Sequence, residues 1–142
     1  MAEMYGLTEE ELYNMAYSNT QRKMPPPVKT IRSVCTYPQP EEDEDMEEIG
    51  LWTISNSNFL FGAASILYDS LLFELAEKLD DDLFIIPSSI HECRAVPVSM
   101  AKLQDVKNMH MEAGEMLNRE EWLSDQIYIY SRKMRKLTIA KE

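Results

Sequence analysis

The sequence has few of the residues that mark metal, disulfide or phosphate sites. Its two cysteines, Cys35 and Cys93, are too few for a disulfide scaffold, and neither has a second Cys or His at the spacing of a zinc site. The four glycines are scattered, so the chain has no phosphate-binding loop, and nucleophile elbows are absent. We therefore expect no cofactor and no metal. The scarcity of cysteine indicates a reducing, cytoplasmic location.

Long hydrophobic runs are also lacking. No apolar stretch approaches the roughly 20 residues that span a bilayer, and the first residues lack the basic start of a signal peptide. Basic side chains are fewer than acidic ones, with 14 Lys and Arg against 25 Asp and Glu and a net charge of −11. These features predict no membrane association and disfavour direct binding to nucleic-acid phosphates.

What is present is a globular composition. The 142 residues are 44% hydrophobic and 27% charged, and a chain of this length can bury one hydrophobic core without the help of disulfides or bound metals. We expect a single domain over residues 1–142.

The acidic excess is concentrated in one segment. Residues 41–48 hold seven acids and no base, residues 51–130 carry a net charge of −8, and the last twelve residues carry +4. We expect an acidic loop over 38–48 and a basic segment over 131–142. The loop is either a solvated connector or a docking surface for a protein partner with a basic surface. The docking residues would be Glu41, Glu42, Asp43, Glu44, Asp45, Glu47 and Glu48.

Hydrophobic periodicity and capping residues predict three helices. Thr8 and Glu11 form a capping box at the start of the first, which should end near Asn19, ahead of three prolines. Asp69 should cap the second helix, and Gly114 should weaken or end the third. The apolar stripes of the second and third helices are Leu71, Leu72, Leu75, Ala76 and Leu79, and Leu103, Val106, His110 and Ala113.

Short apolar or alternating runs predict strands between these helices. The expected strands are 31–34, 51–54, 59–66, 83–86, 93–98, 126–130 and 137–140. Residues 51–54 and 59–66 should form a hairpin around a turn at 55–58, and 93–98 should pair antiparallel with 83–86. Because helices and strands do not alternate regularly, the predicted class is α+β, with an antiparallel sheet of six or seven strands and about three helices.

One cluster has the residue types of a chemical site. The 87–92 segment (Pro87-Ser88-Ser89-Ile90-His91-Glu92) puts a base, a carboxylate and two hydroxyls within five residues. On a strand, His91 and Glu92 would point to opposite faces, which argues against catalysis. The alternative is a turn in which the serines bond backbone groups and His91 packs partly buried. The candidate binding residues are Ser88, Ser89, His91 and Glu92.

Several stretches together resemble an uncharacterised bacterial family, a domain of unknown function common in gut anaerobes and mobile elements. They are 6–13 (GLTEEELY), 19–20, 58–68, 75–79, 87–92 (PSSIHE) and 123–125 (LSD). The resemblance implies that this chain corresponds to the C-terminal part of a longer family architecture. It also implies that Asn is more common than His at position 110.

Three functional hypotheses follow. The first is a non-catalytic acidic interaction protein, associated with mobile elements and able to form a homodimer. Its sharper version is an acidic mimic of nucleic acid that inhibits a host defence enzyme, which requires the acids to share one face. Those acids would be Asp69, Asp80, Asp81, Asp82, Glu112, Glu115, Glu120 and Glu121. The second hypothesis is a hydrolase centred on His91 and Glu92, with Ser88 and Ser89. The third is that the chain is an autonomous remnant of a longer protein and functions only in an assembly.

Overall fold

A computed structural model describes residues 2–23 and 51–141 of the protein. The expected strand at 31–34, the expected loop at 38–48 and the seven acidic docking residues lie outside the described residues.

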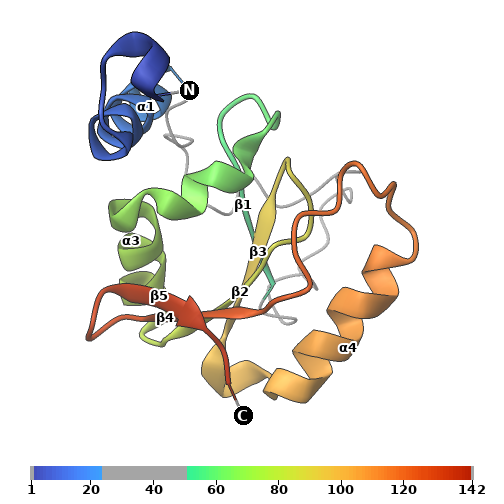
Figure 1. The fold of residues 1–142 in the computed structure, drawn as a ribbon. Helices are drawn as coiled ribbons and strands as arrows, with labels where there is room; N and C mark the ends of the chain where they lie inside the picture. The colour runs from blue at the N-terminus through green and yellow to red at the C-terminus, as the bar shows by residue number, and fades with distance from the viewer. Residues whose placement is uncertain (1, 24–50, 142) are drawn as a thin grey trace.

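The described chain forms one antiparallel sheet with helices around it, which confirms the α+β class (Figure 1). The sheet has five strands in the order β1-β3-β2-β4-β5, fewer than the six or seven expected. The strands are β1 (Trp52–Ile54), β2 (Leu83–Ile86), β3 (Cys93–Pro97), β4 (Tyr128–Ser131) and β5 (Lys136–Ile139). The α-helices in these two ranges are α1 (Glu9–Lys23), α3 (Asp69–Leu79) and α4 (Leu103–Gly114), and the 3₁₀ helices are η1 (Ala2–Tyr5), η3 (Gly62–Leu67) and η4 (Val98–Met100).

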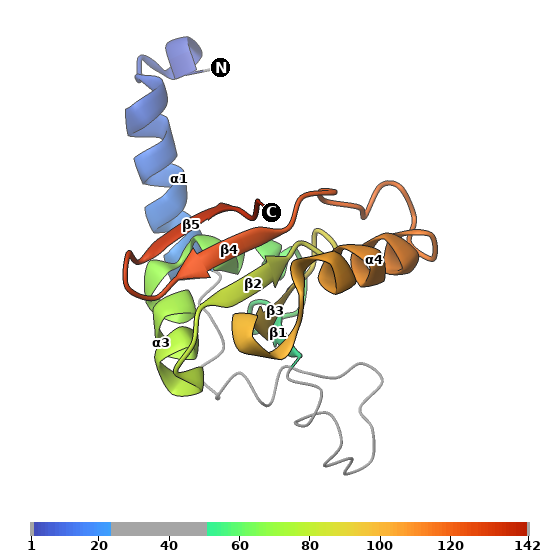
Figure 2. The same cartoon turned by 90° about the horizontal axis from the view of Figure 1, so that it is seen from below.

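The central strand β2 is buried on both faces because its four residues are all apolar and alternate in direction. Leu83 and Ile85 join a core on the α3 side, whereas Phe84 and Ile86 join a second core on the α4 side. Figures 1 and 2 accordingly show α3 and α4 on opposite sides of the sheet. The sheet therefore lies between two helical layers.

Helix α1 begins where the capping box predicts. The Thr8 hydroxyl accepts from the backbone N–H of Glu11, and the Glu11 carboxylate accepts from the backbone N–H of Thr8 at 2.8 Å. The helix continues past the expected end at Asn19 to Lys23, because residues 20–23 include no Pro or Gly to stop it. It buries no residue of its own and projects from the body (Figure 2). It is attached mainly through Tyr17, whose hydroxyl donates to the backbone carbonyl of Leu67 at 3.0 Å.

The predicted strand at 59–66 is wrong. Residues Gly62–Leu67 form η3 instead, and Phe59 and Phe61 before it have positive φ angles of 54° and 52°, which no strand accommodates. The Asn56 side chain holds this loop, since it accepts from the N–H of Leu60 and donates to its carbonyl oxygen. Side-chain hydrogen bonding to the loop backbone replaces a sheet ladder here.

The predicted cap of the second helix is also wrong. Tyr68 is the N-cap residue of α3, and its side chain makes no capping hydrogen bond. The Tyr68 side chain packs in the core and makes an edge-on contact with the Tyr17 ring, with centroids 6.3 Å apart. Burial of an aromatic ring, rather than capping, thus sets the start of this helix.

Candidate functional site

The 87–92 segment forms the turn between β2 and β3, as the turn alternative predicted. The backbone N–H of Ser89 donates to the carbonyl of Glu92 at 3.0 Å, and the Ser89 hydroxyl accepts from the backbone N–H of His91 at 3.1 Å. The backbone N–H of Ile90 donates to the carbonyl of Glu121 at 2.9 Å. These bonds fix the segment against the chain that follows α4 and leave its side chains pointing in different directions.

The His91 imidazole packs against the loop before η3. Its Nδ1 accepts from the backbone N–H of Phe61 at 3.1 Å, and the two rings lie 5.3 Å apart. Because Nδ1 is an acceptor, the neutral ring carries its proton on Nε2, which lies 4.0 Å from Oε1 of Glu121. The ring is 30% exposed. His91 is therefore the partly buried packing residue of the turn interpretation, and it orders the loop that exposes Phe59, Leu60 and Phe61.

The hydrolase hypothesis needs the His91 imidazole within about 3 Å of a serine hydroxyl or a carboxylate, and its contact with the Glu121 carboxylate is 4.0 Å long. The Ser89 hydroxyl meets the backbone of His91 instead of its ring, and the Ser88 hydroxyl points to the carbonyl of Ile86 at 3.5 Å. Glu92 pairs with Arg94 rather than with His91. The four candidate residues consequently do not form a catalytic set in this geometry.

Three of the four candidates instead line a cleft of about 280 Å³ between the sheet and α4. One side holds the polar groups of the turn and of β3, and the other is formed by α4 and the residues after it, which are mostly apolar. The lining residues are Ile86, Ser88, Ser89, Glu92, Arg94, Met109, His110, Ala113, Met116 and Leu117. His91 is not among them.

Arg94 is a cleft residue that no sequence pattern identified as a site residue. Alternation along β3 places it on the α4 face, paired in register with Ile86 of β2 and on the same side as Val96. Its Nη2 contacts Oε1 of Glu92 at 3.4 Å, and its Nε is buried without a hydrogen-bond partner. A charged residue within a buried strand was the signal that could have identified it, because such a residue requires a local reason.

The far wall of the cleft is held rigidly. His110 of α4 is 2% exposed, its Nε2 lies 2.7 Å from the carbonyl oxygen of Ser124, and its ring stacks on Trp122 with centroids 4.5 Å apart. Trp122 also lies against Gly114, where a Cβ would come within 2.3 Å of the indole. The end of α4 is thus anchored to residues 122–124 on the far side of the cleft.

Cys93 faces away from this cleft. It belongs to the core on the α3 side, where its thiol lies 3.8 Å from the carbonyl oxygen of Ala63. Burial, together with the smaller effect of the nearby Glu92 charge, raises the pKa of the Cys93 thiol to about 12. The sulfur is consequently a protonated core group at neutral pH and not a nucleophile.

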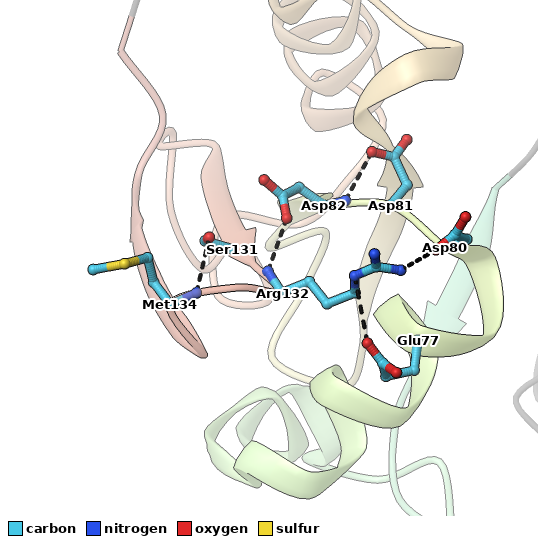
Figure 3. A network of polar contacts seen from close by, with 7 residues as sticks. All are labelled: Glu77, Asp80, Asp81, Asp82, Ser131, Arg132 and Met134. Carbon is cyan, nitrogen blue, oxygen red and sulfur yellow. Dashed lines mark hydrogen bonds and ion pairs between the residues drawn. The ribbon is translucent and has the colours of Figure 1, made fainter.

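Seven of the eight acids proposed for nucleic-acid mimicry fall into two groups at opposite ends of the sheet, and the eighth, Asp69, is the first residue of α3. Asp80, Asp81 and Asp82 follow α3, and Figure 3 shows them around Arg132, which also contacts Glu77 at 3.4 Å. Arg132 makes an ion pair with Asp80 through its guanidinium, and its backbone N–H donates to Asp82 at 2.8 Å. These carboxylates bind the β4–β5 turn to the end of α3. Glu112, Glu115, Glu120 and Glu121 lie on and after α4.

Residues 2–23 and 51–141 form neither a metal-binding cluster nor a membrane-spanning helix. No group of three or more His, Cys, Asp or Glu side chains there could hold a metal ion. No helix in these ranges is both long enough and apolar enough to cross a bilayer.

Fold and site together define a small α+β protein with an antiparallel sheet between helices and one mixed polar and apolar cleft. The chain belongs to the family described as "Family of unknown function (DUF5688)", whose model matches residues 1–132. The match includes every element through β4 and ends before β5. Comparison with curated proteins and with solved structures finds no match.

Proposed function

We propose that this protein is a non-catalytic binding protein and that the cleft beside the 87–92 segment is its binding site. The observation that carries the proposal is the incomplete pairing of Arg94 at the cleft. The Arg94 side chain is 43% exposed beside the cleft and its ion pair with Glu92 is 3.4 Å long, so an anion in the cleft can pair with its guanidinium more closely. Ser88, Ser89 and Glu92 contribute further polar groups to the same cleft.

The test fills the cleft without disturbing the core. Ala113 is exposed on α4 and lines the cleft, so Ala113→Phe should occupy the space, whereas Ala16→Phe on the exposed face of α1 is the matched control. Each purified protein is equilibrated with small molecules extracted from cells, and the retained compounds are identified by mass spectrometry. We expect wild type and Ala16→Phe to retain an unaltered compound that Ala113→Phe loses. Equal retention by all three proteins would contradict the proposal.

A second candidate function is docking of a basic protein partner by the acidic residues 41–48. Seven acids in eight positions favour it, because such a segment attracts a basic surface over long range. A variant with these acids changed to Asn and Gln should lose a partner that wild type captures, and wild-type capture should weaken as salt rises from about 50 to 200 mM. An unchanged set of partners would make the segment a connector.

The other sequence hypotheses have less support. The mimic requires one acidic face, but Asp80, Asp81 and Asp82 are committed to contacts at the end of α3. The hydrolase requires His91 within about 3 Å of a serine hydroxyl or a carboxylate, but the Ser89 hydroxyl bonds backbone and the Glu121 carboxylate lies 4.0 Å from the ring. A cytoplasmic location, association with mobile elements and homodimer formation remain part of the proposal. Light scattering on the purified protein tests the last of these.

A further inference from the structure

We propose that the cleft binds a free α-amino acid with an apolar side chain, with its carboxylate on Arg94 and its ammonium group at Glu92. This inference rests on the proposed binding function and names the class of ligand.

Arg94 supplies the site for a carboxylate. Its guanidinium has five N–H donors, but Glu92 accepts from it only at 3.4 Å, longer than the roughly 2.7–2.9 Å of a strong charged hydrogen bond. The planar fork of an arginine matches the two oxygens of a carboxylate, and a ligand can therefore improve on the pairing that Glu92 provides.

The Glu92 carboxylate favours a zwitterionic ligand over a ligand that carries only a carboxylate. A ligand with only a carboxylate would take Arg94 from Glu92 and place a second negative charge beside it, within a protein of net charge −11. An α-amino acid carries its ammonium on the same carbon as its carboxylate. It can satisfy Arg94 and Glu92 together, so that neither charge is left without a partner.

The opposite wall selects an apolar side chain of limited size. Met109, Ala113, Met116 and Leu117 present apolar surface, and methionine adapts its shape to different ligands. The cleft volume of about 280 Å³ lies just below the roughly 300–1,000 Å³ of pockets that hold drug-sized ligands, which suits a small molecule such as leucine or methionine.

The experiment compares L-leucine with its two half-charged analogues by isothermal titration calorimetry on the full chain. Leucine should bind with a Kd on the order of 0.1 mM, whereas 4-methylpentanoate, which lacks the amine, and 3-methylbutylamine, which lacks the carboxylate, should each bind at least ten-fold more weakly. This series needs no variant and therefore does not depend on how a substitution folds. Equal binding of leucine and either analogue would overturn the inference.

Two variants test whether Arg94 binds the carboxylate of leucine and Glu92 its ammonium group. Arg94→Gln should weaken leucine binding at least ten-fold, whereas Arg22→Gln on α1 should leave it unchanged. Glu92→Gln should weaken leucine binding but strengthen binding of 4-methylpentanoate, because the repelling carboxylate is gone; Glu74→Gln on α3 is the control. Weakening of both ligands by Glu92→Gln would contradict the assigned role of Glu92.

The outcome separates this inference from the proposed function. If leucine and methionine do not bind but Ala113→Phe abolishes retention of another compound, the amino-acid inference is wrong and the cleft remains a binding site. If neither amino acid binds and Ala113→Phe changes nothing, both proposals are wrong.

Discussion

Gly62 lies where neighbouring groups leave no room for a side chain. A Cβ at this position would come within 2.0 Å of the Ser55 hydroxyl, 2.5 Å of the Asn56 nitrogen and 2.8 Å of the His91 carbonyl oxygen. Two of these three atoms belong to the backbone and cannot turn aside. The close approach lets Ser55 donate to the His91 carbonyl at 2.7 Å and joins the loop before η3 to the 87–92 segment.

Gly62→Ala should therefore destabilise the fold by about 3 kcal/mol, at the upper end of the usual cost of overpacking. Ala64→Ser, on the exposed side of η3, should change stability by less than about 0.5 kcal/mol. Urea unfolding followed by circular dichroism measures both values. A Gly62→Ala variant as stable as wild type would show that the loop and the turn are not packed together as described.

The buried thiol of Cys93 gives a second prediction at this scale. With a pKa raised to about 12, Cys93 should not react with a thiol reagent at pH 8 until the protein unfolds. The measurement uses a Cys35→Ala background, so that one thiol is counted, with denatured protein as the positive control. Rapid reaction of the native protein would contradict the burial of Cys93.

Among the elements, α1 is the one least tied to the body. No residue of α1 is buried, and the helix contacts the body through Tyr17, whose hydroxyl bonds the Leu67 carbonyl and whose ring meets that of Tyr68. A helix with so little tertiary packing depends on its own capping and propensity.

Loss of the capping box should consequently act on α1 alone. Thr8→Ala removes the acceptor for the Glu11 N–H, and amide exchange in the first turns of α1 should accelerate roughly five-fold. Exchange in β2 and the melting temperature should not change, because the two cores do not include the start of α1. A lower melting temperature would mean that α1 folds together with the sheet.

At the scale of the whole molecule, carboxylates join the helices to the sheet. Asp81 connects the end of α3 to η4, since its two oxygens accept from the backbone N–H groups of Asp82 and Ser99, each at 2.8 Å. Burial raises the pKa of Asp81, but the hydrogen bonds from Ser99 and Asp82 and the charge of Arg132 outweigh it and hold this pKa below its usual value.

This lowered pKa makes part of the stability dependent on pH. A group with a lower pKa in the folded state stabilises the fold above its unfolded pKa of about 4, and the contribution is lost as pH falls through the folded pKa. Asp81→Asn can keep only one of the two bonds and should cost about 1 kcal/mol at pH 7. Its difference from wild type should shrink below about pH 4 in urea unfolding. Glu74→Gln is the control, and a difference that stays constant with pH would contradict the prediction.

The sequence predicted best where one local signal dominates. The capping box at Thr8 and the apolar run of β2 both have the predicted form, because each depends on neighbouring residues. It failed at 59–66, where Phe59, Leu60 and Phe61 suggested a strand. Their conformation is imposed by Asn56 and by His91, and His91 is thirty positions away from Phe61.

In the candidate site, too, the features set by neighbouring residues were predicted and those set by distant residues were not. The sequence by itself determined that Ser88, Ser89, His91 and Glu92 form a polar turn between two core strands, because serines and a proline next to apolar runs favour a turn. It did not identify Arg94, Met109 or Met116, since the cleft exists only when α4 packs against the α4 face of β2 and β3. Tertiary structure alone decided that His91 faces the Phe59–Phe61 loop while Glu92 faces the cleft. The physical reason is that the direction of a turn side chain depends on what packs against the turn, and here its partners come from residues 55–62 and 109–121.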